Sequence, residues 1–390
     1  MAKLCRFAGN WKPLNEDFLD KKLQERKDLD AFRRLRLPDG KTDLCSNDYL
    51  GIATNGLIEK ALAGQPGHLD QSGQRRQPVP HGSGGSRLLA GNYPLIEETE
   101  KELAAFHVAE AGLIFNSGYD ANLGLLSCLP QRGDTVLYDQ LSHASIRDGI
   151  RLSFAHAFSF GHNDLQDLEK KLQGTKGTTF VVTESVFSMD GHQAPLAEMA
   201  TLCLNYGAHL IVDEAHATGV IGAKGEGLVQ QLHLESACFA RVHTFGKAVG
   251  CHGAVVLGSH RLRDYIINFS RPFIYTTALP PSALLAIQKA YSLFPAMHPG
   301  RAHLQVLVSR FQEAHLPFEK LNSRTPIQGV LTPGNQAARS MAAALQDEGL
   351  DIRPILYPTV PGGSERLRIV LHAFNTVAEV DKLIAVLQKT

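Results

Sequence analysis

The sequence predicts an α/β protein with a large domain built on a mostly parallel sheet and a smaller C-terminal α+β domain. Between about residues 113 and 256, short β-rich runs alternate with helical patterns, an order typical of parallel sheets. After about residue 290 the pattern changes to that of an α+β unit. The 390 residues, 44% of them hydrophobic, are enough for a large core and a second, smaller one.

Five runs in the central part of the chain predict strands. They are "GLIFNSG" (112–118), "DTVLYDQ" (134–140), "TTFVVTESVFS" (178–188), "AHLIVDEAH" (208–216) and "ARVHTFGK" (240–247). Between the third and fourth runs, apolar residues recur at helical spacing from Leu196 to Leu204, behind Pro195 and before Gly207. A strand, a helix and a strand within this length indicate a right-handed parallel crossover.

Polar residues follow the ends of these predicted strands. Because the carboxyl ends of parallel strands share one edge of a sheet, a ligand is expected at that edge. The residues that fall at or just after strand ends are Asn116, Ser117, Asp139, His143, Ser188, Asp213, His216, Thr244 and Lys247.

Three parts are predicted along the chain. Residues 1–45 form a charged helical segment beside the smaller domain, 46–289 the large domain and 290–390 the smaller one. In the large domain, "PLIEETEKELAAFH" (94–107) predicts a helix after a glycine-rich stretch. For the smaller domain the patterns predict a strand at 327–332, a helix at 335–349, an extended stretch at 351–360, a strand at 366–373 and a closing helix at 377–388.

The composition argues against several classes of protein. The 39 basic residues balance 39 acidic ones, so no overall positive field attracts nucleic acids or anionic membranes. The first residues lack the apolar run of a secretory signal, and no apolar run approaches the length of a membrane span. Six cysteines without a C-x-x-C pair argue against a zinc site and a disulfide framework. We expect a cytoplasmic protein with no metal and no nucleic-acid or membrane partner.

The stretch "LIVDEAHATG" (210–219) allows two chemistries. In a nucleotide-driven motor, Asp213 and Glu214 would hold magnesium and activate water. Such a motor also needs the loop G-x-x-x-x-G-K-[ST] to cradle phosphates. "GSGGSR" lacks the lysine, and in "TFGKAVG" an alanine follows the lysine, where a magnesium-binding hydroxyl is needed. A nucleotide-driven motor or a non-catalytic nucleic-acid binder remains an alternative, although the sequence has no phosphate-binding loop.

The second chemistry is that of pyridoxal 5'-phosphate (PLP). Lys247 ends a buried strand among small residues, where partial desolvation would lower its pKa and favour Schiff-base formation. Asp213, in a neighbouring strand position, would pair with the protonated pyridine nitrogen. Taken singly, Lys247 would also fit an exposed loop lysine, and Asp213 would also fit a helix cap. Together they provide the amine and the acid that PLP needs.

The remaining polar residues at this edge match the other parts of the cofactor. Backbone N–H groups near Gly118 and Tyr119, at a predicted helix start, would bind its phosphate. The hydroxyl of Thr244 would add a donor. His143 would stack on the pyridine ring. The phenolic oxygen would be bound by Ser188 and His216.

Nine motifs follow one another along the chain: "SNDYLG", "GSGGSRLLAGNYPLIEETEKELAAFH", "SGYDAN", "LSHASIRDG", "HNDLQDLEKKL", "VVTESVFSMDGHQAPLAEM", "VDEAHATGVIGAKGEG", "TFGKAVGCHGA" and "PTVPGGSERLRI". Their order and wording resemble the α-oxoamine synthases, fold-type I PLP enzymes that condense an amino acid with an acyl thioester. The resemblance covers nearly the whole chain. Within the family, the wording is most similar to the branch that uses L-alanine and a pimeloyl thioester in biotin biosynthesis. A glycine-using or serine-using synthase and a PLP aminotransferase remain alternatives.

The resemblance implies a role for each matching residue. Lys247 would carry the cofactor as a Schiff base, and Asp213 would pair with its ring nitrogen. The implied catalytic set is Lys247, His143, Asp213 and His216. The implied cofactor contacts are Gly118, Tyr119, His143, Ser188, Asp213, His216, Thr244 and Lys247.

The resemblance also implies the substrate contacts. Asn47 and Arg368 would hold the carboxylate of the amino acid, a task suited to an arginine fork. Arg33, or Arg34 in its place, and Thr359 would contact the acyl substrate. The implied partners are L-alanine, pimeloyl-CoA or a pimeloyl acyl carrier protein, and a second copy of the chain in a homodimer.

One position departs from the family pattern. Two residues before the proline of "PTVP", where an arginine is expected, this chain has Leu356. Arg353 lies three residues earlier. Either Arg353 takes over the role of the arginine or the role is absent.

Overall fold

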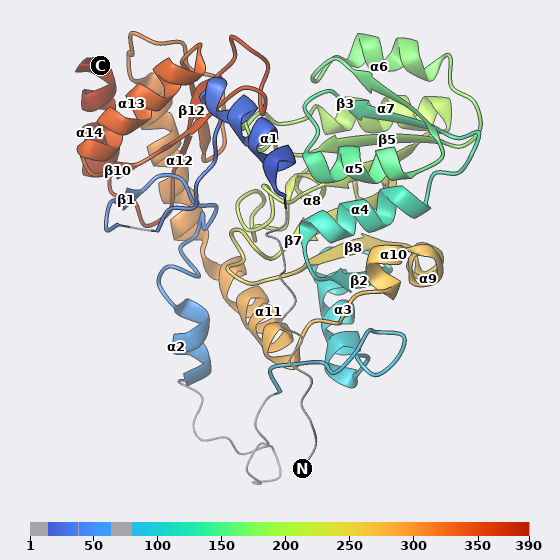
Figure 1. Ribbon diagram of the computed structural model, residues 1–390. Helices are drawn as coiled ribbons and strands as arrows, with labels where there is room; N and C mark the ends of the chain where they lie inside the picture. The colour runs from blue at the N-terminus through green and yellow to red at the C-terminus, as the bar shows by residue number, and fades with distance from the viewer. Residues whose placement is uncertain (1–14, 38, 64–79, 390) are drawn as a thin grey trace, which may run out of the picture.

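The computed structural model describes residues 15–37, 39–63 and 80–389; the first 14 residues of the predicted N-terminal segment lie outside these ranges. Figure 1 shows a large sheet with helices on both faces and a smaller unit beside it. The seven strands of the large sheet lie in the order β2-β8-β7-β6-β5-β3-β4. Among them only β8 runs antiparallel to its neighbours, so the predicted mostly parallel sheet is confirmed. The strands are β2 (Ala111–Phe115), β3 (Thr135–Asp139), β4 (His156–Phe160), β5 (Thr179–Glu184), β6 (His209–Asp213), β7 (Cys238–Thr244) and β8 (Ala254–Gly258).

Both faces of the large sheet are buried. In β5, for example, Val181 belongs to one buried apolar cluster and Val182 to the other, because successive side chains point to opposite faces. A sheet covered on both faces favours continuous apolar strands, as the sequence has. The helices of this part are α3 (Pro94–Phe106), α4 (Gly118–Cys128), α5 (Ala144–Leu152), α6 (Leu165–Leu172), α7 (Leu196–Tyr206), α8 (Leu228–Gln231), α9 (His260–Phe269), α10 (Arg271–Ile274) and α11 (Pro281–Leu293), with a short 3₁₀ turn at Glu235–Ala237.

The crossover helix α7 follows its predicted pattern with one exception. It begins directly after Pro195 and ends at Gly207, whose φ of 63° is left-handed and suits glycine. The exception is Leu204, which is 81% exposed, so the apolar stripe is narrower than predicted.

Two strands of the large sheet are absent from the sequence prediction. Strand β4 lies at the edge of the sheet with four exposed residues before Phe160, and its five residues HAFSF are too short a run for periodicity to identify. Strand β8 is a short apolar run, which periodicity alone does not distinguish from a piece of helix.

The smaller unit contains an antiparallel sheet in the order β11-β12-β9. Its elements are β9 (Ile327–Leu331), β10 (Leu350–Asp351), β11 (Arg353–Ile355), β12 (Arg366–Val370), α12 (His298–Glu313), α13 (Asn335–Asp347) and α14 (Val377–Lys389), after a 3₁₀ turn at Phe294–Ala296. The N-terminal part contributes to it, because β1 (Thr42–Asp43) pairs with β10. The exact division of the chain at residues 45 and 289 stays a prediction.

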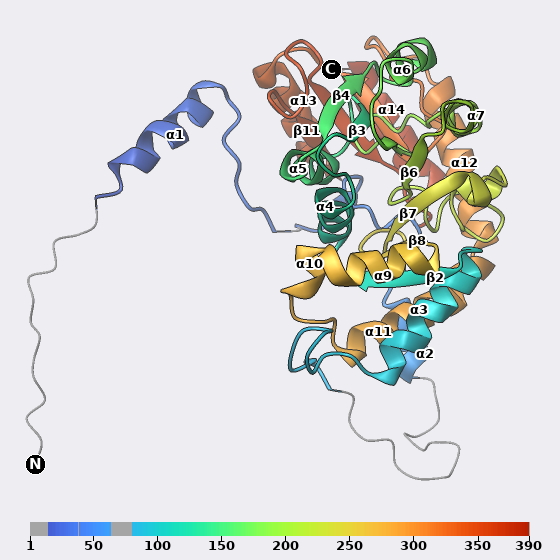
Figure 2. The same ribbon diagram turned by 90° about the vertical axis from the view of Figure 1, so that its right-hand side faces the viewer.

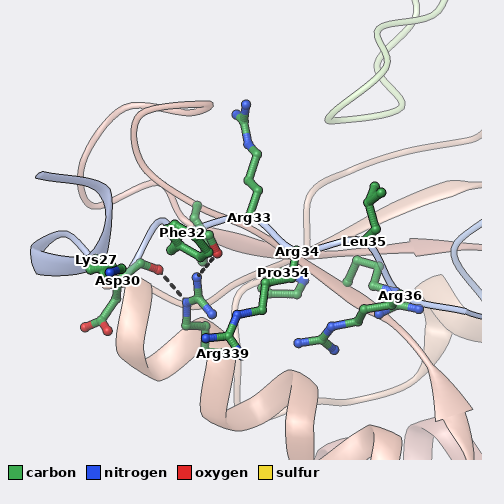
Figure 3. Close-up of a pocket in the computed structure, with 11 residues that line it drawn as sticks. Lys27, Asp30, Phe32, Arg33, Arg34, Leu35, Arg36, Arg339 and Pro354 are labelled. Atoms are coloured by element: carbon green, nitrogen blue, oxygen red, sulfur yellow. Dashed lines mark hydrogen bonds between the residues drawn. The ribbon is translucent and has the colours of Figure 1, made fainter. Parts of the chain in front are cut away.

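The first helices lie at the margin of the molecule. Helix α1 (Asp17–Asp28) has no buried residue, and Figure 2 shows it standing apart from the body. Contact with the smaller unit is made by the residues that follow, since Arg339 of α13 donates hydrogen bonds to the carbonyl oxygens of Asp30 and Phe32 (Figure 3). Helix α2 is Leu57–Ala63. Within the described ranges, no helix is both long and apolar enough to span a membrane.

Candidate active site

The carboxyl ends of four parallel strands bring the predicted site together. Asp213 ends β6, and Glu184 ends β5 directly beside it in the strand register. Lys247 follows β7, the neighbour of β6 on its other side, and His143 follows β3, the neighbour of β5. The sheet topology therefore places at one edge residues that are about a hundred positions apart in the sequence.

Lys247 lies against His216, with its Nζ atom 2.9 Å from Nε2 of the ring. Burial lowers the pKa of Lys247 to about 8, although the nearby Asp213 and Glu184 carboxylates act in the opposite direction. A lysine with a lowered pKa is more often unprotonated near neutral pH, so it is a better nucleophile for a carbonyl carbon.

His216 is held on its other side by Tyr49. The Tyr49 hydroxyl lies 2.6 Å from Nδ1 of the ring. Burial, together with the charge of Lys247, lowers the pKa of His216 well below its usual range, and burial raises the pKa of Tyr49 to about 12. The neutral ring offers one donor and one acceptor, and Tyr49 and Lys247 take one each.

Asp213 is a buried carboxylate that accepts hydrogen bonds from two neighbouring groups. Its oxygens accept from the Asn122 side chain at 2.7 Å and from the backbone N–H of Ala215 at 2.9 Å. Asn122 also donates to the Ser145 hydroxyl at 3.0 Å, which lies 2.8 Å from Nδ1 of His143. The orientation of the His143 ring is therefore tied to Asp213 through two neutral side chains.

Glu184 is a site residue that the sequence prediction missed. It is 2% exposed and accepts a hydrogen bond from the backbone N–H of His143 at 2.7 Å. Burial and the Asp213 charge raise the pKa of Glu184 to about 8. The sequence carries a signal for Glu184, an acidic residue at the end of the apolar run "TFVVTE", but the predicted strand extends to Ser188 and so places the strand end too late.

The start of α4 has the features expected of an anion-binding site. Ser117 caps the helix by accepting a backbone N–H of its first turn. A Cβ atom on Gly118 would lie 3.3 Å from Oγ1 of Thr244, so the helix start and this hydroxyl meet at one point. Tyr119 follows, and its ring lies 6.5 Å from that of His143 at 79°. Backbone N–H groups and a hydroxyl at a helix N-terminus match the needs of a phosphate.

The predicted substrate residues form two pairs. Arg368 donates to Asn47 at 2.9 Å and to the backbone carbonyl of Ser188 at 2.7 Å. Arg33 donates to Thr359 at 3.3 Å. Thr359 also lines a cavity of about 450 Å³ whose walls include Ser142, His143, Phe187, Ser188, Met189 and Val360. The cavity therefore connects His143, predicted to stack on the cofactor ring, with the loop predicted to contact the acyl group.

Two residues left open by the sequence have defined contacts. Arg353 pairs with Asp351 at 2.8 Å and lines a different pocket, together with Leu356. Glu214 is fully buried, and its carboxylate accepts hydrogen bonds from the Ser185 hydroxyl and the first backbone N–H groups of α8. With its oxygens engaged in this way, Glu214 is a structural cap and not a metal ligand.

The donor set fits PLP. It combines the amine of Lys247, whose pKa is lowered, with the buried carboxylate of Asp213 and the nearby ring of His143. The start of α4, where Gly118 lies beside the Thr244 hydroxyl, completes the set. The fold and this site define a fold-type I PLP-dependent transferase.

The chain belongs to the aminotransferase class I and II family, whose model matches residues 39–387. It is 40% identical to an 8-amino-7-oxononanoate synthase of Marinobacter nauticus over 95% of both chains. It is 41% identical to the protein of that name from Emericella nidulans over 94% of both. The predicted family resemblance is thereby confirmed.

Solved structures agree on the fold. A serine palmitoyltransferase from S. paucimobilis with bound PLP matches with a TM-score of 0.83 and 28% identity over 96% of both chains. An 8-amino-7-oxononanoate synthase from Francisella tularensis matches with a TM-score of 0.74 and 29% identity, over 90% of this chain and 98% of the other. The predicted fold class is thereby confirmed.

Proposed function

We propose that the protein condenses L-alanine with a pimeloyl thioester, releasing carbon dioxide and a free thiol and forming 8-amino-7-oxononanoate for biotin biosynthesis. The observation that carries the proposal is the group formed by Lys247, His216 and Asp213, in a chain 40% identical to synthases of this name over almost its full length. We also propose that it works in the cytoplasm as a homodimer, with the acyl group delivered on coenzyme A or acyl carrier protein.

The residues of the chain divide the binding tasks. Lys247 would hold PLP, with Asp213 at the ring nitrogen, His143 on the ring face, and Ser188 and His216 at the phenolic oxygen. Gly118, Tyr119 and Thr244 would hold its phosphate. When bound, the cofactor supplies an electrophilic carbonyl carbon and a ring that accepts the electron pair left when an α-proton is removed.

The protein groups then orient the substrate and move protons. Arg368 and Asn47 bind the carboxylate of alanine, which places its α-carbon near Lys247. The free amine of Lys247 would act as general base toward the α-proton of the bound amino acid and would later return a proton. Asp213 would keep the ring nitrogen of the bound cofactor protonated. Arg33 and Thr359 orient the incoming acyl group beside His143.

The substrate choice is tested with a matrix of amino acids and thioesters. Alanine, glycine and serine are each combined with pimeloyl, acetyl and palmitoyl thioesters, and free thiol is measured. The proposal expects the highest kcat/KM with alanine and the pimeloyl donor. Lys247→Ala should stay folded but lose turnover and the yellow colour of the loaded enzyme. Full turnover by that variant would refute the assignment of Lys247.

A serine-using synthase is the second candidate. It is favoured by the TM-score of 0.83 with a serine palmitoyltransferase, against 0.74 with the synthase from F. tularensis. Highest turnover with serine and a long-chain donor would establish it. Release of a keto acid without thioester consumption would instead indicate an aminotransferase.

A further inference from the structure

Two histidines and an aspartate that have no role in the proposed function lie together in the loops that follow β4 and β5. His162 follows β4, and Asp190 and His192 lie between β5 and α7. The nitrogen and oxygen atoms that these side chains could offer to a metal all lie within 4.8 Å of one another. In the described part of the chain, no other group of three histidine, cysteine or acidic side chains is close enough to share a metal ion.

The two histidine rings face each other with one nitrogen each. Nε2 of His162 lies 3.0 Å from Nδ1 of His192. On the other side of its ring, Nδ1 of His162 lies 3.1 Å from both carboxylate oxygens of Asp139. Because a carboxylate accepts hydrogen bonds, Nδ1 of His162 carries the proton and Nε2 turns a lone pair toward His192. Histidines that ligate a metal almost always have such a hydrogen-bond acceptor at the other nitrogen.

The distance between the two facing nitrogens suits a single metal ion. Zinc binds imidazole nitrogens at roughly 2.0–2.1 Å in tetrahedral geometry, so two nitrogens on one ion lie about 3.3 Å apart. The 3.0 Å between His162 and His192 is slightly shorter, and rotation of the two rings would open it. His192 would then carry its proton on Nε2, so that both facing nitrogens present lone pairs to the ion.

The charges around the two rings favour a cation. Asp139 and Asp190 are both buried. Within the described ranges, the only lysine or arginine that pairs with either carboxylate is Arg366, which binds Oδ1 of Asp190. Two buried carboxylates beside one guanidinium leave an excess of negative charge, and a divalent cation would offset it.

An unpaired acceptor lies next to the histidines. The side-chain oxygen of Asn163 is buried and has no hydrogen-bond partner among the described residues. The amide nitrogen of the same side chain lies 3.4 Å from Nε2 of His162. Buried acceptors are nearly always paired, so an unpaired one at this place indicates a site for a water or an ion. The side chain of His162 is 15% exposed, which leaves a path by which an ion can enter.

We propose that His162, His192 and Asp190 bind a zinc-type divalent cation, with Asp139 orienting the ring of His162. Two imidazoles and one carboxylate favour zinc over magnesium or calcium, which prefer oxygen ligands. The absence of a C-x-x-C pair, on which the sequence predicts no metal, says nothing about this site, because its ligands are histidines and an aspartate from two loops.

The ion would link the loop after β4 to the loop after β5. The loop after β5 lines the cavity next to His143 with Phe187, Ser188 and Asp190. The ring of His162 already packs edge-on against Phe187, with ring centres 4.5 Å apart. We therefore expect the ion to stabilise this wall of the cavity and to take no part in the reaction, so the site does not depend on the proposed function.

The test measures zinc binding by calorimetry on the PLP-loaded protein after removal of metals with a chelator. The variants are His162→Gln and His192→Gln. The matched control is His156→Gln, an exposed histidine of β4. Each site variant should weaken zinc binding at least about tenfold, and the control should leave it unchanged. Zinc should also raise the Tm of the wild type and the control but not of the site variants, and magnesium should have no such effect.

Two outcomes overturn the inference. One is equal zinc affinity of the wild type and His192→Gln, which would place any bound zinc elsewhere in the protein. The other is a wild type that binds zinc no more tightly than magnesium. Because His162 also bonds to the buried Asp139, the result with His192→Gln decides alone if His162→Gln does not fold.

Discussion

Replacing Glu184 by glutamine should change how the stability of the protein depends on pH. In the folded protein, burial and the Asp213 charge raise the pKa of Glu184 from 4.5 to about 8. Below the lower value both the folded and the unfolded chain hold the proton, so this residue makes no difference there. As the pH rises toward 8, the unfolded chain releases the proton and the folded protein keeps it, so the free energy of unfolding falls.

The size of the effect follows from the same pKa shift. Between the two pKa values, 4.5 and about 8, each pH unit lowers the free energy of unfolding by up to about 1.4 kcal/mol. Raising the pH from about 5 to 7.5 therefore lowers it by roughly 3 kcal/mol. Glu184→Gln removes the titrating group and keeps an oxygen that can accept the backbone N–H of His143. The variant should therefore gain stability relative to the wild type as the pH rises. Lys247, whose pKa is lowered from 10.5 to about 8, titrates above this window.

The assay is urea unfolding of the cofactor-free protein, followed by circular dichroism at several pH values. Glu198→Gln is the matched control, because Glu198 is exposed on α7. The stability difference between Glu184→Gln and the wild type should grow by a few kcal/mol across the window, and that of the control should stay flat. A difference that does not change with pH would refute the assigned ionisation of Glu184.

Three further substitutions test contacts around the site. Tyr49→Phe removes the hydroxyl beside Nδ1 of His216 and leaves a buried polar atom unpaired, so the free energy of unfolding should fall by about 1–3 kcal/mol; equal stability would contradict that contact. Gly191→Ala should cost more than about 2 kcal/mol in the same measurement, because φ is 71° and a Cβ would overlap a carbonyl oxygen of β9, whereas Gly82→Ala, in open space, should be neutral. Glu214→Gln turns an N–H₂ toward donors of α8 and should cost about 1–3 kcal/mol, with no change in KM for the amino acid if Glu214 is only a cap.

The residues that the sequence identified share a local signature. Asp213 and Lys247 each stand at the end of an apolar strand, and Gly118 stands where a strand turns into a helix. Such positions can be recognised from the sequence alone, because strand ends, turns and helix starts each favour particular residues. The resemblance to the family added Asn47, Arg33 and Thr359. In the structure Asn47 pairs with Arg368, and Arg33 pairs with Thr359.

Other contacts had no such signal. Tyr49 reaches His216 across 167 positions, and Asn122 reaches Asp213 across 91. The partners come from different elements, and only the packing of those elements places them within hydrogen-bond distance. Glu214 looked like half of a metal site in the sequence, and the structure makes it the cap of α8.

The sequence by itself determined the fold class, the crossover helix and the residues at the ligand edge of the sheet, because these follow from periodicity and from short motifs of backbone geometry and side-chain chemistry. Only the tertiary structure decided which groups lie next to the polar residues of the site, such as Tyr49 beside His216 and Arg368 beside Asn47. Electrostatics and burial depend on distances in space, and residues hundreds of positions apart meet only once the chain has folded.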